Sequence, residues 1–372
     1  MIEALAPQVD NRILREDMLA IYENLSPHEI NKLRNSTVLL TGCGGFLGYY
    51  FMHFFAHYAE ELHIKRIIAL ENFLTGTKDW LNQLVASNPD VIKLHEFNVI
   101  TDSVADIPGA ENADFIIHMA SIASPTFYRI YPLETVDANI TGLRRLLDYY
   151  AEKKLRGFLF FSSSEIYGDP FPEFIPTPET YRGNVATIGP RACYDEAKRF
   201  GETLCYLFAQ KYDMAIGIAR PFNNYGPGMN INDKRLPADF AKAVVESRDL
   251  EILSDGTPTR TFCYISDAIT GYLKVMLHGK FDVFNIGMDQ PELSVREFAE
   301  IFNREGKEIF GYQGHIFFSK SADQEYLTDN PNRRCPDLTK ARTVLGYNPS
   351  VRVEDGIRRY LNFLHLTNGQ LA

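Results

Sequence analysis

Cysteine is scarce in this chain, whose 372 residues include only five, at positions 43, 193, 205, 263 and 335. An odd and scattered set fits neither a disulfide framework nor the close spacing of metal ligands, so we expect reduced thiols and no bound metal. No apolar run approaches the roughly 20 residues needed to span a bilayer. The first 17 residues lack the basic start and apolar core of a signal peptide. These absences predict a cytoplasmic protein without a membrane partner.

Positive charge is also in short supply. The chain has 38 Lys and Arg against 48 Asp and Glu, a net charge of −10, and shows no basic face for nucleic-acid phosphates. Its 45% hydrophobic and 23% charged residues are typical of a soluble globular protein. A chain of this length can bury a large core as one big domain or two. The composition therefore argues against a nucleic-acid partner and favours a globular protein.

What the chain does contain is a glycine-rich turn between an expected strand and an expected helix. The apolar run Ser36–Leu40 has strand length, the turn follows at 41–48, and a helical pattern continues over 49–59. In this context glycines permit a tight turn and a close approach of the backbone to a pyrophosphate, which faces the amides at the helix N-terminus. We therefore predict that a dinucleotide binds at Gly42, Gly45, Phe46, Leu47 and Gly48.

A second expected strand, Arg66–Leu70, ends in Glu71 and Asn72. An acidic residue at this distance from the glycines is suited to the ribose hydroxyls of NAD and would repel the 2′-phosphate of NADP. The alternative is a surface glutamate at a strand end. We expect NAD as the cofactor, bound in part by Glu71 and Asn72.

Further buried strands are expected at 91–97, 115–120 and 157–161, separated by amphipathic helices, of which 133–153 is the longest. Buried apolar strands that alternate with helices predict a doubly wound parallel sheet, an α/β fold of the Rossmann type. Ligands of such sheets gather at the carboxyl ends of the strands. These ends carry Ala120, Ser121, Ser163, Ser164 and Glu165.

Tyr194 and Lys198 stand four residues apart in an expected helix, 191–212, and so lie on the same face of it. An ammonium beside a phenol disfavours the protonated form, so a group with a pKa of about 10 can act as a base nearer neutrality. A helix can also carry such a pair by chance. We predict that Tyr194 is a catalytic base and that Lys198 lowers its pKa.

The order and spacing of the glycine turn, the serine cluster and Tyr194–Lys198 resemble the extended short-chain dehydrogenases/reductases, the NAD-dependent epimerase/dehydratase family. The resemblance covers about residues 36–362. Several longer stretches of the chain closely resemble UDP-glucuronate decarboxylases (UDP-xylose synthases). These stretches are residues 118–125, 164–170, 188–199, 220–227, 259–267 and 333–337.

This resemblance implies a nucleotide-sugar enzyme that decarboxylates UDP-glucuronate to UDP-xylose through a 4-keto intermediate. By position, Tyr194 removes the 4-hydroxyl proton, Lys198 also holds the nicotinamide ribose, and Ser163 hydrogen-bonds the 4-oxygen. Ser164 and Glu165 stand where the family handles C5 and its carboxyl group. The resemblance also places residues on the cofactor near its adenine and nicotinamide, namely Asn98, Val99, Ala120, Ser121, Tyr194 and Lys198, although relatives usually carry Asp in place of Asn98.

Three other functions are also compatible with parts of this pattern. A nucleotide-sugar 4-epimerase would share the oxidation step, but epimerases usually carry a small residue in place of Glu165. A 4,6-dehydratase needs an acid where this chain has Ser164, and serine is a poor acid. A non-catalytic NAD-binding scaffold is the alternative from another class, and the presence of Ser163, Tyr194 and Lys198 argues against it.

We expect three regions. Residues 1–35 form an N-terminal helical extension with short helices at 17–22 and 27–33. Residues 36–220, joined by part of 263–287, form the NAD-binding domain, and 221–372 form a smaller, interleaved domain that binds the nucleotide sugar. The resemblance assigns substrate contacts, on a UDP-sugar, to Tyr128, Asn223, Arg235, Arg260 and Arg334. For Tyr128 a buried aromatic is an equal alternative. It also predicts a homodimer, in which helices 133–153 and 191–212 pair across the interface.

Overall fold

A seven-stranded parallel sheet forms the centre of the protein, in a computed structural model that describes residues 12–321, 325, 328 and 330–367. The strand order is β11-β6-β5-β4-β1-β2-β3. The strands are β1 (Thr37–Thr41), β2 (Arg66–Glu71), β3 (Ile92–Glu96), β4 (Phe115–His118), β5 (Gly157–Phe161), β6 (Ile216–Pro221) and β11 (Asp282–Ile286). All five strands expected from the sequence are present, and the order reverses between β1 and β4 as in a Rossmann sheet. The predicted fold class is confirmed.

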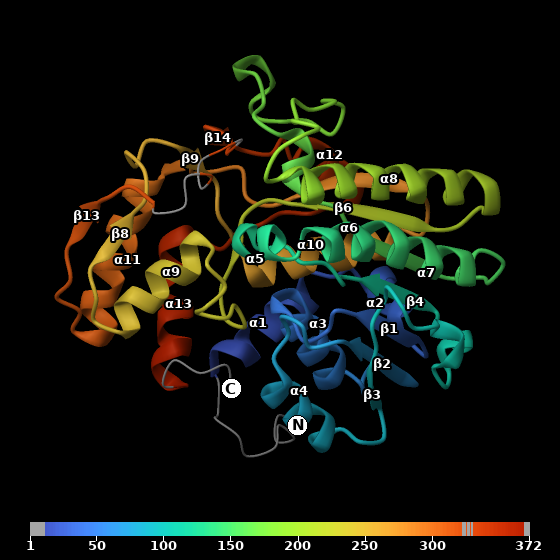
Figure 1. Ribbon diagram of the computed structural model, residues 1–372. Coiled ribbons are helices and arrows are strands. Elements are labelled where there is room, and N and C mark those ends of the chain that lie inside the picture. Colours follow the sequence, from blue (N-terminus) through green and yellow to red (C-terminus); the bar gives the residue numbers. More distant parts are fainter. Residues whose placement is uncertain (1–11, 322–324, 326–327, 329, 368–372) are drawn as a thin grey trace.

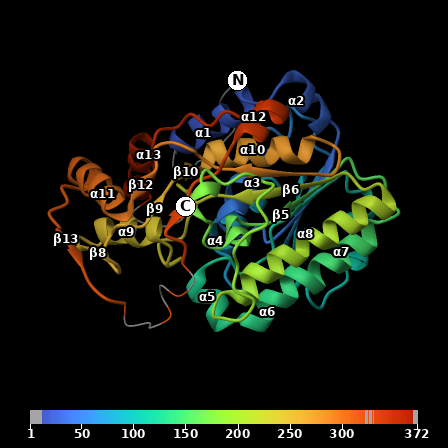
Figure 2. The same ribbon diagram turned by 90° about the horizontal axis from the view of Figure 1, so that it is seen from above.

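Helices cover both faces of this sheet (Figures 1 and 2). Val38 and Leu40 of β1 pack in the core beneath α3 (Phe46–His57) and α10 (Ile265–Leu277). Leu39, between them, packs in the opposite core beneath α7 (Leu143–Tyr150) and α8 (Ala192–Tyr212). Successive side chains of a strand point to opposite faces, so an all-apolar strand has to be covered on both sides.

The expected helix over 133–153 is one helical segment with a wide turn inside it. Helix α6 (Pro132–Asp137) continues through a π-helical turn at Ala138–Gly142 into α7. A Cβ on Gly142 would lie 2.8 Å from Cγ1 of Val99, so only glycine permits this approach. The second expected helix, 191–212, is α8, for which Arg191 is the N-cap.

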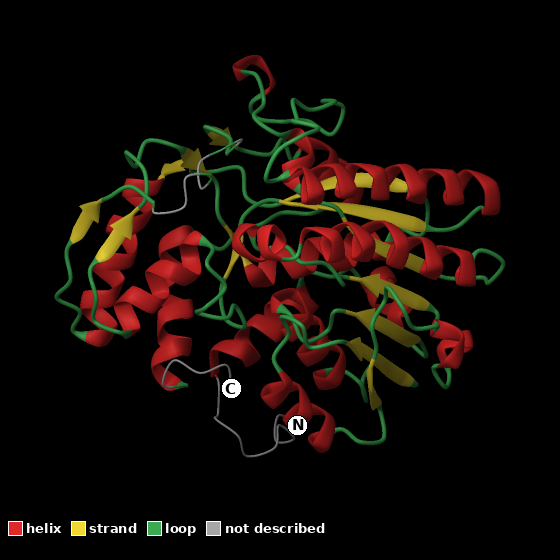
Figure 3. Ribbon diagram, in the orientation of Figure 1, coloured by secondary structure: helices red, strands yellow, loops and turns green. Residues whose placement is uncertain are grey.

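Most of the remaining elements lie to one side of the sheet, around α9 and α11, whereas α4 contacts β3 and α12 contacts β11 (Figures 1 and 3). The helices are α4 (Lys78–Ser87), α5 (Pro125–Ile130), α9 (Leu236–Val245), α11 (Val295–Phe310), α12 (Thr339–Leu345) and α13 (Val353–Leu366). The short strands are β7 (Asn224–Tyr225), β8 (Leu250–Ile252), β9 (Thr259–Arg260), β10 (Cys263–Tyr264), β12 (Leu293–Ser294), β13 (Ile316–Phe318) and β14 (Arg333–Arg334). Single 3₁₀ turns occur at Val104–Asp106, Ala110–Asn112, Ser164–Tyr167 and Pro172–Phe174.

Two N-terminal helices, α1 (Arg12–Glu23) and α2 (Pro27–Leu33), precede the sheet and pack against α10. Asp17 of α1 is fully buried, and its carboxylate accepts hydrogen bonds from the hydroxyls of Tyr50 and Tyr264, each at 2.7 Å. Arg359 of α13 pairs with the same carboxylate at 3.0 Å. Burial raises the pKa of Asp17 to about 6, although these partners favour the charged form. Asp17 thus links the extension to α3, to β10 and to α13.

We predict that Asp17→Ala lowers the free energy of unfolding by about 3–5 kcal/mol, because it leaves a guanidinium and two buried hydroxyls without their acceptor. Urea denaturation measures this. Asp148→Ala is the control, because Asp148 forms an exposed pair with Arg144 and should change stability by less than about 1 kcal/mol. If both variants lose the same small amount of unfolding free energy, Asp17 does not anchor the extension.

Candidate active site

A cavity of about 660 Å³ opens at the carboxyl ends of β1, β2, β4 and β5. Its size falls within the range of about 300–1,000 Å³ that is typical of small-molecule sites. The structure brings together on its wall every site residue expected from the sequence except Tyr128, namely Gly42, Gly45, Phe46, Leu47, Gly48, Glu71, Asn72, Asn98, Val99, Ala120, Ser121, Ser163, Ser164, Glu165, Tyr194, Lys198, Asn223, Arg235, Arg260 and Arg334.

The glycine turn fits a phosphate group. Gly42 has a φ of 69°, and a Cβ there would lie 2.7 Å from the amide nitrogen of Ala120. A Cβ on Gly48 would lie 2.2 Å from the carbonyl oxygen of Cys43. Gly45 differs, because its Cβ would meet only the Gly42 carbonyl oxygen at 3.5 Å, and no side chain caps the helix that it begins. The first amides of α3 can therefore bind an anion in the cavity.

Glu71 both lines the cavity and fastens the glycine turn. One carboxylate oxygen accepts the amide of Gly44 at 2.7 Å, and the other accepts the amides of Asn72 and Phe73 at 3.0 Å each. Burial raises the pKa of Glu71, and the three amides act in the opposite direction. Sequence reasoning missed this clamp between the loops that follow β1 and β2.

Asn98 lies at the cavity wall beyond β3. Its side-chain oxygen accepts the amide of Ile100 at 3.0 Å, so the group left for a ligand is the side-chain NH₂, a donor. An aspartate here would offer only acceptors. Asn98 can therefore still contact adenine as predicted, but it would donate a hydrogen bond where the aspartate of relatives would accept one.

Tyr194 and Lys198 lie on the same face of α8, as the spacing predicts. The Lys198 ammonium is 5.5 Å from the centre of the Tyr194 ring and donates to the carbonyl oxygen of Phe161 at 2.7 Å. Burial lowers the pKa of Lys198 to about 7. Burial also raises the pKa of Tyr194 to about 12, although a hydrogen bond with Ser163 favours the phenolate. Burial therefore outweighs the groups that favour the phenolate, and the pKa of Tyr194 lies above its ordinary value in the protein alone.

Tyr128 is not among the residues that line the cavity and packs against Tyr194, so the structure favours the alternative of a buried aromatic over a substrate contact. The two rings stack with centres 5.2 Å apart and planes inclined by 13°. Tyr128 is 1% exposed, and its hydroxyl has no hydrogen-bond partner among the described residues. The sequence could not choose between these two roles, because whether an aromatic side chain faces a ligand or supports a neighbour depends on tertiary packing.

Glu165 forms the most heavily charged part of the wall. Arg334 binds it with both terminal nitrogens, at 2.7 and 2.5 Å, and Arg191 binds it from the start of α8. Burial disfavours the charge, but the attraction of Arg191 and then Arg334 outweighs it and holds the pKa of Glu165 well below its usual range. Sequence reasoning missed Arg191 and assigned Arg334 to the diphosphate. An arginine one turn before Tyr194 was the available signal.

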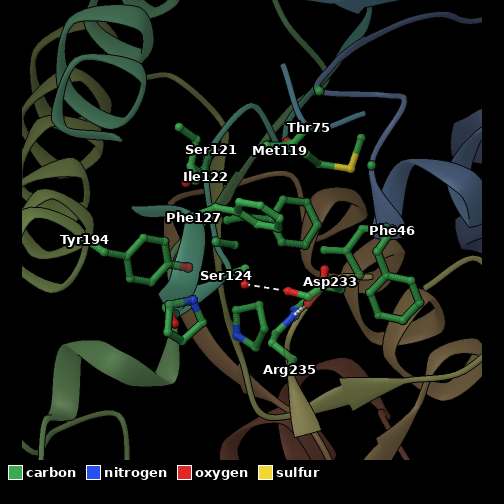
Figure 4. Close-up of a pocket in the computed structure, with 18 of the residues that line it drawn as sticks. Phe46, Thr75, Met119, Ser121, Ile122, Ser124, Phe127, Tyr194, Asp233 and Arg235 are labelled. Carbon is green, nitrogen blue, oxygen red and sulfur yellow. Dashed lines mark hydrogen bonds and ion pairs between the residues drawn. The ribbon is translucent and has the colours of Figure 1, made fainter. Parts of the chain in front are cut away.

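The other expected substrate residues line the cavity from the C-terminal part. Figure 4 shows Arg235 beside Asp233 at the cavity. Arg235 pairs with Asp233, whose carbonyl oxygen accepts the Ser124 hydroxyl at 2.6 Å. Arg260 donates to the carbonyl oxygens of Thr259 and Pro331 at 2.8 and 2.5 Å. Burial and the repulsion from Arg334 lower its pKa to about 9. The side-chain nitrogen of Asn223 donates to the carbonyl oxygen of Thr261 at 2.9 Å.

None of the helices among the described residues is both long and apolar enough to cross a membrane. The same described part of the chain also contains no group of three or more His, Cys, Asp or Glu side chains that could hold a metal ion.

Residues 38–287 match the family model described as the NAD dependent epimerase/dehydratase family. The chain is 35% identical over 326 residues to UDP-glucuronic acid decarboxylase 5 of Arabidopsis thaliana, covering 87% of each chain. It is 33% identical over 341 residues to UDP-glucuronic acid decarboxylase 1 of Xenopus tropicalis, covering 90% of this chain and 74% of that one.

Solved structures agree with this fold. UDP-glucose 4-epimerase of Thermotoga maritima, in a structure with UDP-glucose, has a TM-score of 0.74 at 24% identity, with 89% of this chain and 99% of that one covered. UDP-glucuronic acid 4-epimerase of Bacillus cereus, in complex with UDP-glucuronic acid and NAD, has a TM-score of 0.70 at 23% identity, with 88% and 98% covered. At these identities the likeness concerns the fold.

The chain is therefore a nucleotide-cofactor protein of the Rossmann type, and it belongs to the NAD-dependent epimerase/dehydratase family. NAD is its cofactor, as predicted. The glycine turn and Glu71 are the residues whose geometry fits the dinucleotide, and Tyr194 and Lys198 face the same cavity.

We predict that Gly45→Val weakens NAD binding at least about tenfold, or about 1.4 kcal/mol, while the protein stays folded. The backbone of Gly45 (φ −85°, ψ −177°) suits any residue, but a side chain there would occupy the space that a phosphate approaches. NAD titration and thermal unfolding measure both effects. Ala86→Val, exposed on α4, controls for the added valine. Unchanged NAD affinity in folded Gly45→Val would place the phosphates elsewhere.

Proposed function

We propose that this protein decarboxylates UDP-glucuronate to UDP-xylose, with NAD as a cofactor that is not consumed. The observation that carries the proposal is the partly buried Glu165, which two arginines hold on the cavity wall that Ser163 and Tyr194 also line. The relatives of similar length are named UDP-glucuronic acid decarboxylases, and this supports the same reaction.

In this proposal Tyr194 accepts the proton of the sugar 4-hydroxyl, and Ser163 hydrogen-bonds the same oxygen. Bound NAD supplies the acceptor for the C4 hydride and returns it at the end. Oxidation at C4 makes the C6 carboxylate that of a β-keto acid. The electrons of the C5–C6 bond can then pass into the ketone as CO₂ leaves, and a proton adds at C5.

The wall around Glu165 favours decarboxylation over the related reactions. A dehydratase needs an acid at Ser164, and a buried serine hydroxyl is a poor one. A 4-epimerase has to turn the keto sugar over within the site. Glu165, fixed on two sides by Arg191 and Arg334, leaves a rigid charged wall where epimerases usually carry a small residue.

The C-terminal part, 221–372, is proposed to bind the nucleotide sugar, while 36–220 with part of 263–287 binds NAD. Arg235 and Arg260 face the shared cavity, and guanidinium forks suit diphosphate oxygens. Asn223 is proposed to act with them. A cytoplasmic location is supported by the cysteines, all five of which are unpaired.

Incubation with UDP-glucuronate should release CO₂ and form UDP-pentose without net consumption of NAD. Tyr194→Phe should reduce this activity about 10²–10⁴-fold, because it removes the general base. Mass spectrometry of the nucleotide sugar and trapping of CO₂ measure the reaction. Tyr22→Phe, on α1 away from the cavity, is the control. A product of unchanged mass would indicate 4-epimerisation, and full activity of Tyr194→Phe would contradict the assigned base.

We also propose a homodimer formed through α6, α7 and α8. These helices lie side by side on one flank of the molecule (Figure 2). They expose the large apolar side chains of Leu133, Phe200 and Leu207. Phe200 and Leu207 are seven residues apart, so they lie on one face of α8.

If these helices pair, Leu207→Glu should convert the dimer to a monomer, because the interface would bury an unpaired charge. Light scattering coupled to size-exclusion chromatography measures the mass. Leu19→Glu is the matched control, because Leu19 is equally exposed on the distant helix α1. A Leu207→Glu protein of unchanged dimeric mass would place the interface elsewhere.

A further inference from the structure

Behind the Arg191–Glu165 pair lies a carboxylate that the proposed reaction leaves without a role. Asp195 follows Tyr194 directly in the first turn of α8 and is 4% exposed. Its Oδ2 lies 3.6 Å from Nε of Arg191, beyond hydrogen-bond distance but within that of an ion pair. Asp195 does not line the cavity, and the cavity-lining side chain with which it forms an ion pair is Arg191.

Several polar atoms of this cluster have no hydrogen-bond partner among the described residues. They are Oδ1 of Asp195, Nε of Arg191, Nε of Arg334 and the hydroxyl of Tyr128. Buried polar groups are usually paired, so such a concentration beside a cavity needs an explanation. Nε of Arg191 is a donor without a partner, and Oδ2 of Asp195 is a neighbouring acceptor. A small rotation of the guanidinium would form a hydrogen bond between them.

The charges around Asp195 allow it to titrate while Glu165 stays ionised. Arg191 faces it from the same helix, Arg334 and Glu165 face it from β14 and the turn after β5, and the phenols of Tyr128 and Tyr194 lie nearby. Burial, and then repulsion from Glu165, raises the pKa of Asp195 above its ordinary value. The two arginines are shared between two carboxylates, and Glu165 makes the closer contacts.

We propose that Asp195 is a positioning residue that, when ionised, holds Nε of Arg191 and so fixes the guanidinium that orients Glu165. This inference rests on the proposed decarboxylation, because it assigns Asp195 to the step at C5 and C6. The oxidation at C4 depends on Tyr194 and Ser163, which Asp195 does not contact through a hydrogen bond in the described structure. Loss of the Asp195 charge should therefore slow CO₂ loss more than it slows oxidation.

The test compares Asp195→Asn with the wild type in kcat, KM and the pH dependence of kcat/KM for CO₂ release from UDP-glucuronate. The variant should lose on the order of 10- to 100-fold in kcat, with KM little changed, because a misplaced group costs about this much. In the wild type, kcat/KM should rise with pH as Asp195 ionises. This rise should be absent from the pH profile of Asp195→Asn. Reduced nicotinamide, followed by its absorbance, should accumulate in a single turnover.

A double-mutant cycle with Arg191→Lys separates positioning from general damage. If Asp195 acts through Arg191, the double variant should be no slower than Arg191→Lys alone. Asp267→Asn is the structural control, because Asp267 is a buried carboxylate that accepts the amides of Ser350 and Val351 at 2.8 and 2.7 Å. It should lower thermal stability and leave the pH profile unchanged.

The outcomes are distinguishable. If the wild type releases no CO₂, the proposed function itself fails. If the wild type turns over and Asp195→Asn keeps its rate and pH profile, only the role of Asp195 fails. The role also fails if the effects of the two substitutions multiply, or if Asp195→Asn slows nicotinamide reduction and CO₂ release equally.

Discussion

One buried ion cluster joins the two parts of this protein at the cavity. Glu165 comes from the end of β5, Arg191 from the start of α8, and Arg334 from β14, about 170 residues further along the chain. Glu165 is partly buried, and taking a carboxylate largely out of water costs several kcal/mol unless cations surround it. Because Arg334 lies in the C-terminal part, that part completes the charged wall of the cavity where it packs against the sheet.

The same burial sets the protonation of the two residues on α8. It raises the pKa of the Tyr194 phenol and lowers that of the Lys198 ammonium, so each neutral form is favoured. Proximity of a lysine is therefore not sufficient to make a phenol basic once both groups leave water. The positive charge of oxidised nicotinamide would add the attraction for phenolate that the protein alone does not supply.

The sequence was informative wherever the physical cause was local. The apolar run before Gly42, the glycine spacing and the four-residue interval between Tyr194 and Lys198 depend on strand, turn and helix geometry, and all three are present in the structure. Arg191 was missed, and the role of Tyr128 was left open. For Arg191 the signal was its position one turn before Tyr194, and for Tyr128 no local signal says whether it faces the cavity or a neighbouring side chain.

The amino-acid sequence by itself determined the alternation of strands and helices, the glycine turn and the face of α8 that carries Tyr194, because each follows from periodicity and from what glycine permits. Only the tertiary structure decided which charges meet. In the folded protein Arg334 pairs with Glu165, Glu71 accepts a hydrogen bond from the glycine turn, and Tyr128 stacks on Tyr194. These outcomes depend on burial and on contacts between distant segments, since a side chain's partner and pKa are set by what surrounds it after folding.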